Sequence, residues 1–407
     1  MKSHSLSLPV SAVSRAAGHG APLQYFAGLF FALRIAITYI AFQSAPRVGT
    51  AAALGMEMLL FGAAFGWGFG NDGFRMKQLT ASRTLRWLTA YLAFAGASVL
   101  WTQADSGAIA AAYWTGMALD AATALFLLKS IDPTEQLDGL MRGFVMGSIG
   151  VALIAWFSPT LPDLRIGNEE FLHPNGLGLE FATAFFCAQY LATKNSRWHW
   201  AAAALGISLL RTISKTSIIA ALVAESFYLL RWSGMSRKAR LGTACTAMVA
   251  VASFWGLLEA YFSAYASKGN QAETLTGRTA IWAMAIVMGM DSPWIGHGIY
   301  SFRALIPSFG SFQPTHAHNE LLQQFFEYGA IGVSLAGMVY FSLFRSARRA
   351  MADPYGKLAL VLICFALVHG LTDTVNFGLS FPLWLAAAFS IVLEVDATGS
   401  IAKGGGA

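Results

Sequence analysis

Long apolar stretches recur along most of the chain and are separated by shorter polar segments. They lie near residues 24–42, 51–70, 87–103, 108–128, 140–158, 174–193, 198–212, 214–231, 242–262, 325–344, 357–375 and 379–394. A helix needs about 20 mostly apolar residues to cross the hydrocarbon core of a bilayer, and the stretch at 198–212 is short by that measure. The pattern predicts about twelve membrane-spanning α-helices.

The composition of the chain narrows its class further. Of its 407 residues, 56% are hydrophobic and 12% are charged. The charged share is about half of what soluble domains carry, which is too little to cover so large an apolar core. These values exclude a soluble enzyme, a disordered chain and a coiled coil. We predict one all-α polytopic transmembrane domain over residues 1–407.

The basic residues are distributed unevenly between the predicted loops. If the N-terminus is cytoplasmic, 19 of the 27 basic residues fall in inside segments, and Arg34 lies within the first span. Cytoplasmic loops carry such an excess, so both ends are predicted to be cytoplasmic, and the net charge of +6 does not indicate nucleic acid. The outside segments hold the remaining seven: Arg47, Arg165, Arg211, Lys215, Lys268, Arg278 and Arg303.

One long hydrophilic connection, residues 263–324, falls on the outside in this topology. It contains an apolar run from Thr279 to Met290 that predicts a short helix, a turn at 291–293, and the sequence His316-Ala317-His318-Asn319. Long loops over a rigid scaffold often carry function. The chain has no GxxxxGK[ST] motif, which argues against nucleotide-driven transport.

The excess of basic residues in inside segments does not explain the cations on the outer side, so their presence there needs another reason. Arg211 and Lys215 are four residues apart in a short turn between two spans, and Arg278 follows a glycine at the start of the predicted loop helix. On a helix that spacing puts Arg211 and Lys215 on one face. Such cations could hold a diphosphate through charge-assisted hydrogen bonds, or they could contact phospholipid headgroups.

The two histidines of the long loop are candidates for proton transfer. His318 at a water interface can act as a general base, with Asn319 and Glu320 to orient it. If the segment is extended or helical, the side chains of His316 and His318 are expected to point in different directions. The alternatives are exposed loop histidines, or a zinc site with His297 as third ligand, which no cysteine or close carboxylate pair supports.

Two further features lie within or next to the spans. His173-Pro174-Asn175-Gly176 opens a span, where Pro174 suits the first helical turn and Asn175 could cap the helix or line a cavity. Charged residues within the spans are expected to face the bundle interior, either as interhelical pairs or as a proton relay. They are Arg34, Glu57, Asp120, Glu180, Glu225 and Asp373.

The order of motifs over residues 170–375 resembles the O-antigen ligase and polysaccharide polymerase family of bacterial membrane glycan transferases. The distance from His318 to Gly329 matches the family's His-x10-Gly signature, and His173-Pro174-Asn175 and Ser214-Lys215-Thr216 occupy its upstream positions. The remaining motifs are Thr276-Gly277-Arg278-Thr279-Ala280-Ile281-Trp282, Pro293-Trp294-Ile295-Gly296-His297-Gly298, His316-Ala317-His318-Asn319-Glu320-Leu321-Leu322 and Glu327-Tyr328-Gly329-Ala330-Ile331-Gly332.

The resemblance implies a GT-C-type helical fold in the bacterial inner membrane, with the active site facing the periplasm. It implies an undecaprenyl-diphosphate-linked glycan donor, two arginines on the diphosphate and a histidine base. Arg278 and His318 match these positions, whereas Lys215 stands where the family has its other arginine, so Lys215 or Arg211 would serve there. We add as substrate-binding candidates His316, Asn319, Arg303, His173 and Asn175.

The implied reaction is an inverting displacement that needs no metal and no cofactor. Two versions of this reaction differ in their acceptor. A ligase transfers the glycan to lipid A–core, and a polymerase extends a second lipid-linked repeat. The family description favours the ligase, with the polymerase as the alternative. A polysaccharide transporter or flippase, supported by the charged residues within the spans, is a more remote alternative. Membrane lipids are expected as further partners.

Overall fold

The computed structural model describes residues 21–395 except for residue 45, residues 72–75, 131, 162–164 and 168–171, most of 232–274, and residues 309–312 and 375–381. The described residues form helices and no strand, which confirms the all-α prediction. The first half of the chain forms α1 (Ala21–Ser44), α2 (Pro46–Gly70), α3 (Met76–Ala81), α4 (Arg83–Ala97), a 3₁₀ turn η2 (Ser98–Leu100), α5 (Gly107–Leu127), α6 (Pro133–Phe157) and α7 (Pro174–Lys194).

The second half of the chain continues the helical pattern around a bent central helix. It forms α8 (Trp198–Arg211), α9 (Lys215–Arg231), α11 (Leu275–Gly289), α12 (Phe302–Leu305), α13 (Glu320–Arg349), α14 (Pro354–His369), α15 (Pro382–Ser390) and a π-helical turn η4 (Ile391–Val395). The predicted loop helix at 279–290 is confirmed as α11. Each predicted apolar stretch falls on one of these helices except 242–262, which lies outside the described residues.

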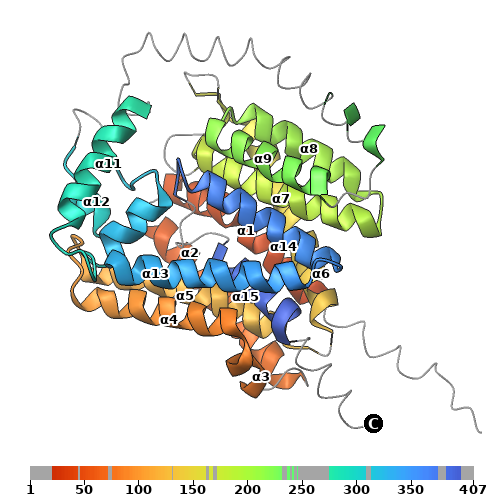
Figure 1. The fold of residues 1–407 in the computed structure, drawn as a ribbon, viewed down its shortest axis with the longest axis horizontal. Helices are drawn as coiled ribbons and strands as arrows, with labels where there is room; N and C mark the ends of the chain where they lie inside the picture. Colours follow the sequence, from red (N-terminus) through yellow and green to blue (C-terminus); the bar gives the residue numbers. More distant parts are fainter. Residues whose placement is uncertain are drawn as a thin grey trace, which may run out of the picture.

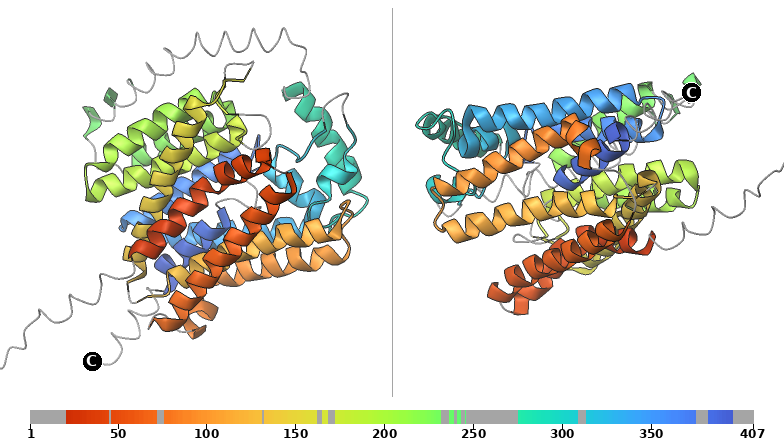
Figure 2. Two further views of the ribbon diagram at one scale, coloured as in Figure 1. Left: turned by 180° about the vertical axis from the view of Figure 1, so that it is seen from behind. Right: turned by 90° about the horizontal axis from the view of Figure 1, so that it is seen from below.

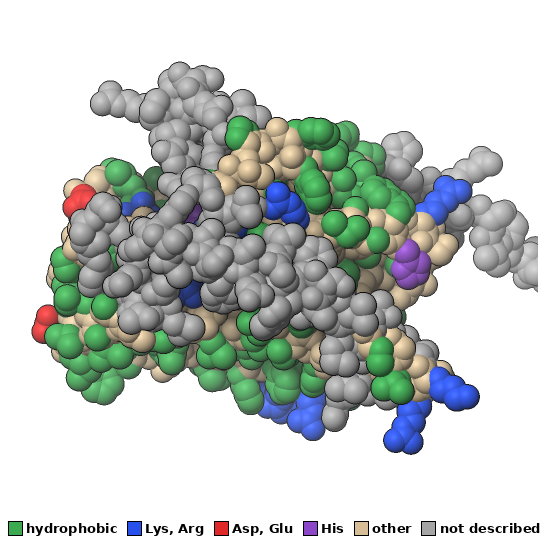
Figure 3. All heavy atoms as spheres, turned by 90° about the horizontal axis from the view of Figure 1, so that it is seen from above, with side chains coloured by type: hydrophobic (Ala, Val, Ile, Leu, Met, Phe, Trp, Pro, Cys, Tyr) green, Lys and Arg blue, Asp and Glu red, His purple; other side chains and the backbone are tan. Residues whose placement is uncertain are grey.

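Three of the described helices are long and apolar enough to cross a membrane by length and composition. They are α5, α6 and α13, and several shorter helices, including α14, are also apolar. Large side chains such as Phe69, Phe157 and Leu100 are exposed on the helices. Figure 3 shows hydrophobic side chains over much of the described part of one face. This character is that of a membrane protein, while the count of twelve spans stays a prediction.

Local sequence signals account for the start of several helices. Asp132 and Asp353 accept hydrogen bonds from backbone N–H groups in the first turns of α6 and α14, and a proline follows each of them. At α7 the cap is the side chain of His173, with Pro174 in the first turn as predicted. Capping side chains satisfy N–H groups that have no partner within the helix, and proline has no N–H to lose there.

The helices pack through small residues and a few buried polar pairs. A Cβ at Gly143 of α6 would lie 1.8 Å from Tyr25 O of α1, so this close crossing requires glycine. Arg34 of α1 donates to Glu57 of α2 and to Asp120 of α5, which confirms interhelical pairing for these three charges.

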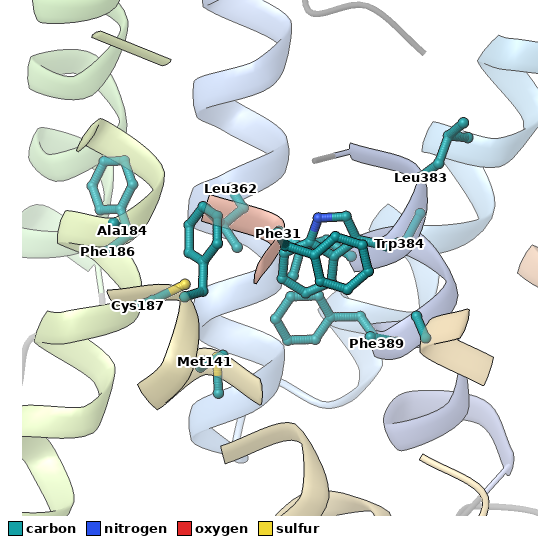
Figure 4. Close-up of a cluster of buried hydrophobic side chains, with 14 of the residues drawn as sticks. Phe31, Met141, Ala184, Phe186, Cys187, Leu362, Leu383, Trp384 and Phe389 are labelled. Carbon is teal, nitrogen blue, oxygen red and sulfur yellow. The ribbon is translucent and has the colours of Figure 1, made fainter. Parts of the chain in front are cut away.

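The hydrophobic core joins the two ends of the chain. The indole of Trp384 in α15 stacks on Phe31 of α1 with ring centroids 4.9 Å apart, and Phe389 lies in the same cluster (Figure 4). In Figure 1, α7, α8 and α9 form one group, and α4 and α5 lie on the other side of α13. Figure 2 shows α1 and α2 together at one face, with α11 and α12 grouped at one end of the molecule.

The break in α13 determines how the loop before it docks. Gly329 has φ 62° and ψ −164° inside the helix, and a Cβ there would lie 2.3 Å from the carbonyl carbon of Trp294. Around this break the backbone N–H of His297 donates to Phe326 O, and that of Ile331 donates to Trp294 O. The segment 293–298 therefore packs into the break in α13, eleven positions beyond His318.

Candidate functional site

The histidine segment before α13 is held from both sides. Trp282 Nε1 of α11 donates to Ala317 O at 2.9 Å, and the backbone N–H of Ala317 donates to Gln323 Oε1 at 2.7 Å. Asn319 caps α13 by accepting from the backbone N–H of Leu322, and its side-chain amide donates to Leu371 O. The predicted role of Asn319 in orienting the ring of His318 is therefore wrong: its amide is used on backbone groups.

The rings of His316 and His318 lie against each other. Their centroids are 4.1 Å apart at an interplanar angle of 74°, and the backbone N–H of His318 points at His316 Nδ1. The expectation that they point in different directions is wrong, because His318 has φ 49° and is neither extended nor helical. The left-handed backbone turns the second ring back over the first.

Asp373 orients the ring of His318. His318 Nδ1 lies 3.3 Å from Asp373 Oδ1, and both side chains are largely buried. Burial raises the pKa of Asp373, but the hydrogen bond from His318 and the nearby histidines outweigh it, so the pKa of this carboxyl is well below its usual range. An ionised carboxylate can only accept, so the neutral form of His318 carries its proton on Nδ1 and has its lone pair on Nε2.

Asp373 is thus corrected from a charge within a span to a residue of the site. The apolar stretch predicted at 357–375 ends earlier, because α14 stops at His369. The segment 369–374 that follows turns across the ends of other helices. Its carbonyls accept from Arg278, Asn319 and the backbone N–H of Glu320. The carboxylate of Glu320, which was predicted to orient His318, accepts from Gln324 Nε2 at 2.8 Å.

His316 is held in its neutral form. Burial and the positive charges of His318, His173 and Arg303 lower its pKa to about 3, against the opposing effect of Asp373. A neutral His316 that accepts from the backbone N–H of His318 carries its proton on Nε2. It therefore acts as a packing and hydrogen-bonding partner of His318.

Three cations gather at the start of α9. Lys215 is the first residue of α9, next to Ser214, whose Oγ accepts from the backbone N–H of Ser217. The charges of Arg165 and Arg278 both act on Lys215. Arg278 donates to the carbonyl of Thr372, the residue before Asp373. The cation group and the His318–Asp373 pair therefore meet at the segment after α14.

Sequence reasoning missed two members of this arrangement. Arg165 is one of the basic residues on the predicted outer side, and this position is the signal by which the sequence could have identified it. His369 is buried at the end of α14, where a hydrogen bond of 3.1 Å joins its Nε2 to Ser217 Oγ. No spacing in the sequence links His369 with Ser217, because they come from helices far apart in the chain.

The candidates at the start of α7 join the same region. Asn175 Oδ1 accepts from Ser214 Oγ at 3.0 Å, so Asn175 contacts the turn that carries Lys215. His173 acts on His316 through its charge. A Cβ at Gly178 would lie 2.6 Å from Ser217 Oγ, so α7 and α9 approach closely here. The predicted alternative of Asn175 as helix cap is wrong, since His173 is the cap.

Two predicted cations lie apart from that group. Arg211 lies over the ring of Trp156, 6.0 Å from its centroid, beside an apolar groove of about 320 Å³ between α6 and α8. Arg303 lies over the ring of Tyr300 at 4.2 Å, and its charge acts on His316. The charge of Arg278 acts on Lys215, which makes Lys215 the better-supported of the two candidates for its partner.

Among the described residues, the group that could hold a metal differs from the set considered in the sequence. Ligand atoms of His316, His318 and Asp373 lie within 4.8 Å of one another, so this group could accept a metal ion. His297, the predicted third ligand, instead hydrogen-bonds Met288 O and packs on Phe326. Within this group His318 Nδ1 and Asp373 Oδ1 are already joined by a hydrogen bond.

Comparison with known proteins adds one match. Residues 200–337 match the family model described as O-antigen ligase. The matched range contains Lys215, Arg278, His318 and Gly329, and it ends before Asp373. A search of curated proteins gave no match.

Proposed function

We propose that this chain, whose residues 200–337 match the family model described as O-antigen ligase, transfers a glycan from an undecaprenyl-diphosphate-linked donor to a sugar hydroxyl. The family consists of membrane glycosyltransferase-like enzymes that act on lipid-linked glycans. The observation that carries the proposal is a convergence at residues 369–374: Thr372 hydrogen-bonds Thr216, next to Lys215, and accepts from Arg278, while Asp373 pairs with His318.

The cations bind and stabilise the leaving group. In the proposed reaction the bond from the anomeric carbon to the diphosphate oxygen breaks, and the diphosphate leaves with the electron pair. Lys215, Arg278 and Arg165 hold this group and stabilise the charge that develops on it. Their mutual repulsion in the free protein is relieved when a dianionic group binds between them.

His318 takes the proton of the acceptor hydroxyl. The acceptor oxygen bonds to the anomeric carbon on the face opposite the diphosphate, and its proton passes to His318 Nε2. Asp373 holds Nδ1 and stabilises the imidazolium that forms, as a carboxylate does in other acid–base pairs. A single displacement inverts the anomeric centre. The donor already carries its activation, so the step uses no metal and no nucleotide.

The finer assignments follow from the family and the hydropathy pattern. We propose a GT-C-type fold with about twelve spans in the bacterial inner membrane and the site facing the periplasm. We propose a ligase that delivers to lipid A–core, with the polymerase as the alternative. The transporter has less support, because Arg34, one of the charges that suggested it, is paired with two of the others, Glu57 and Asp120.

Transfer by the purified full-length protein tests the proposal. The assay uses a synthetic undecaprenyl-diphosphate-linked oligosaccharide and a core-type acceptor, with donor binding measured in parallel. His318→Ala is expected to reduce kcat by about 10²–10⁴-fold with donor binding nearly unchanged. Asp373→Asn, which keeps the shape of the side chain but not the charge, is expected to reduce kcat as well. His199→Ala, an exposed histidine at the start of α8, is the matched control.

A gene deletion separates the two transferases. Loss of capped lipopolysaccharide with long chains still on the lipid carrier indicates a ligase, and single repeats alone indicate a polymerase. Full activity of His318→Ala, or a dependence on zinc that a chelator removes, would contradict the proposed chemistry.

A further inference from the structure

The backbone of Tyr300 is held in an unusual conformation. Among the described residues, three that are not glycine have positive φ: Ile213 at 53°, Tyr300 at 66° and His318 at 49°. Ile213 lies two residues before Lys215, and His318 is the proposed base. Side chains in this region of φ are strained, and such residues concentrate at functional sites when the surroundings enforce them. Tyr300 is the one of the three that the proposed reaction does not use.

The surroundings of Tyr300 do enforce its conformation. The backbone N–H of Gly298 donates to Glu327 O of α13 at 2.8 Å. Thr102 Oγ1 donates to Ile299 O at 2.6 Å, from the segment after η2. The turn that carries Tyr300 is therefore held from two directions by segments that are not part of the loop.

The fixed turn presents an aromatic pair with a guanidinium on top. The rings of Tyr300 and Tyr113 of α5 have centroids 5.1 Å apart, and Arg303 Cζ lies 4.2 Å from the Tyr300 centroid. Arg303 is exposed while both tyrosines are partly buried. A guanidinium stacked on a ring is held in position and keeps its edge N–H groups free for bidentate recognition of a carboxylate or phosphate.

Two sets of cations lie near the histidine pair. Arg278 donates to the carbonyl of Thr372, next to the Asp373 that pairs with His318, and the charges of Arg278 and Arg165 act on Lys215. Arg303 follows Phe302, which packs in one hydrophobic cluster with Ala317, the residue between the two histidines. An inverting displacement brings the acceptor from the face opposite the leaving group. If the first set holds the leaving diphosphate, the second set remains for the acceptor.

Building on the proposed transferase function, we propose that Tyr300, Tyr113 and Arg303 form the acceptor subsite, and that the acceptor sugar carries an anionic group. The tyrosine rings offer a flat apolar surface to a sugar ring, and Arg303 binds a phosphate or carboxylate on that sugar or its neighbour. The subsite delivers the attacking hydroxyl to His318, and it discriminates against neutral acceptors.

Acceptor binding and transfer, measured separately, test the subsite. The probes are synthetic oligosaccharides that carry a phosphate, a carboxylate or neither on the accepting sugar, applied to the full-length protein in lipid nanodiscs. Binding of each probe is measured without donor. Arg303→Gln is expected to weaken binding of the preferred anionic probe by about tenfold or more and to raise its KM equally. Binding of the neutral probe and the KM for the donor are expected to stay unchanged.

Matched variants separate this role from a structural one. Arg303→Lys is expected to restore part of the anionic preference, and Tyr300→Leu, which removes the ring, to weaken binding of all probes more than Tyr300→Phe does. Arg197→Gln, an exposed arginine between α7 and α8, is the control. Equal binding of the anionic probes to wild type and Arg303→Gln overturns the inference, as does a change confined to the donor. Failure of the wild type to transfer overturns the proposed function, while the donor-free binding assay still decides on the subsite.

Discussion

At the scale of single residues, the choice between Lys215 and Arg211 is the first that experiment can decide. Lys215 shares its surroundings with Arg165 and Arg278, whereas Arg211 lies over Trp156. Loss of a charge-assisted phosphate contact costs about 1.5–3 kcal/mol, or roughly 10- to 150-fold.

We therefore expect Lys215→Ala and Arg278→Ala each to weaken donor use by about that factor, and Arg211→Ala to have a smaller effect. Lys215→Arg is expected to keep or improve donor use, because the guanidinium offers a bidentate contact. The measurement is the KM and Kd for the lipid-linked donor. A larger loss in Arg211→Ala than in Lys215→Ala would show that the cation group is assigned wrongly.

His316 connects the site to the pH dependence of stability. Its folded pKa of about 3 is below the value of about 6.5 in an unfolded chain. As pH falls through 6.5, the unfolded chain binds a proton that the folded protein does not, so the free energy of unfolding decreases. Asp373, whose pKa is also lowered, loses its contribution only below the unfolded value of about 4.

The change in Tm between pH 6.5 and pH 4.5 therefore reports on His316. We expect the Tm of the wild type to fall over this interval and that of His316→Gln to fall less. His199→Gln, at an exposed position, should follow the wild type. Parallel curves for wild type and His316→Gln would show that His316 becomes protonated without cost in the folded protein.

At the scale of elements, the break in α13 links the two halves of the site. Gly329 has positive φ and lies against the backbone of 294–295, so it fixes the loop that precedes the turn of Tyr300. Its separation from His318 by ten residues is thus a structural spacing. The first part of α13 carries His318 at its start, and the break beyond it receives the loop.

Gly329→Ala is expected to destabilise the protein by at least about 1–3 kcal/mol, because alanine is strained at this φ and its Cβ would meet Trp294. Gly337→Ala, further along α13 with no atom near its Cβ, should be neutral or stabilising. Thermal unfolding of the two variants in the same detergent makes the comparison. Equal Tm values would mean that the loop adjusts without cost.

At the scale of the whole molecule, the topology decides which side of the membrane the site faces. The excess of basic residues in the inside segments predicts that residues 263–324 are periplasmic. In a chain whose native cysteines are replaced, we expect a membrane-impermeant thiol reagent applied from outside to label Asn270→Cys. Ser196→Cys, between α7 and α8, should stay unlabelled until the cells are opened. The reverse pattern would contradict both the topology and the outward-facing site.

The sequence by itself determined the helices, the membrane character and the residues of chemical interest. Hydropathy runs predict helices because a helix satisfies its own backbone in an apolar medium. Three candidate residues, Lys215, Arg278 and His318, were identified from the sequence. Cations on the outer side and a histidine at a membrane interface are unusual whatever the tertiary structure. The resemblance to the glycan transferases rested on local motifs, and the family match confirmed it.

The tertiary structure alone decided which of those residues lie together. Periodicity shows which residues share a face of one helix, but it does not show which other helix that face meets. The end of α14 at His369 converted Asp373 from a charge within a span into the partner of His318, 55 positions earlier. The positive φ of His318 brought His316 beside it. Such contacts depend on how α7, α9, α13 and α14 pack, and packing joins residues that no local pattern relates.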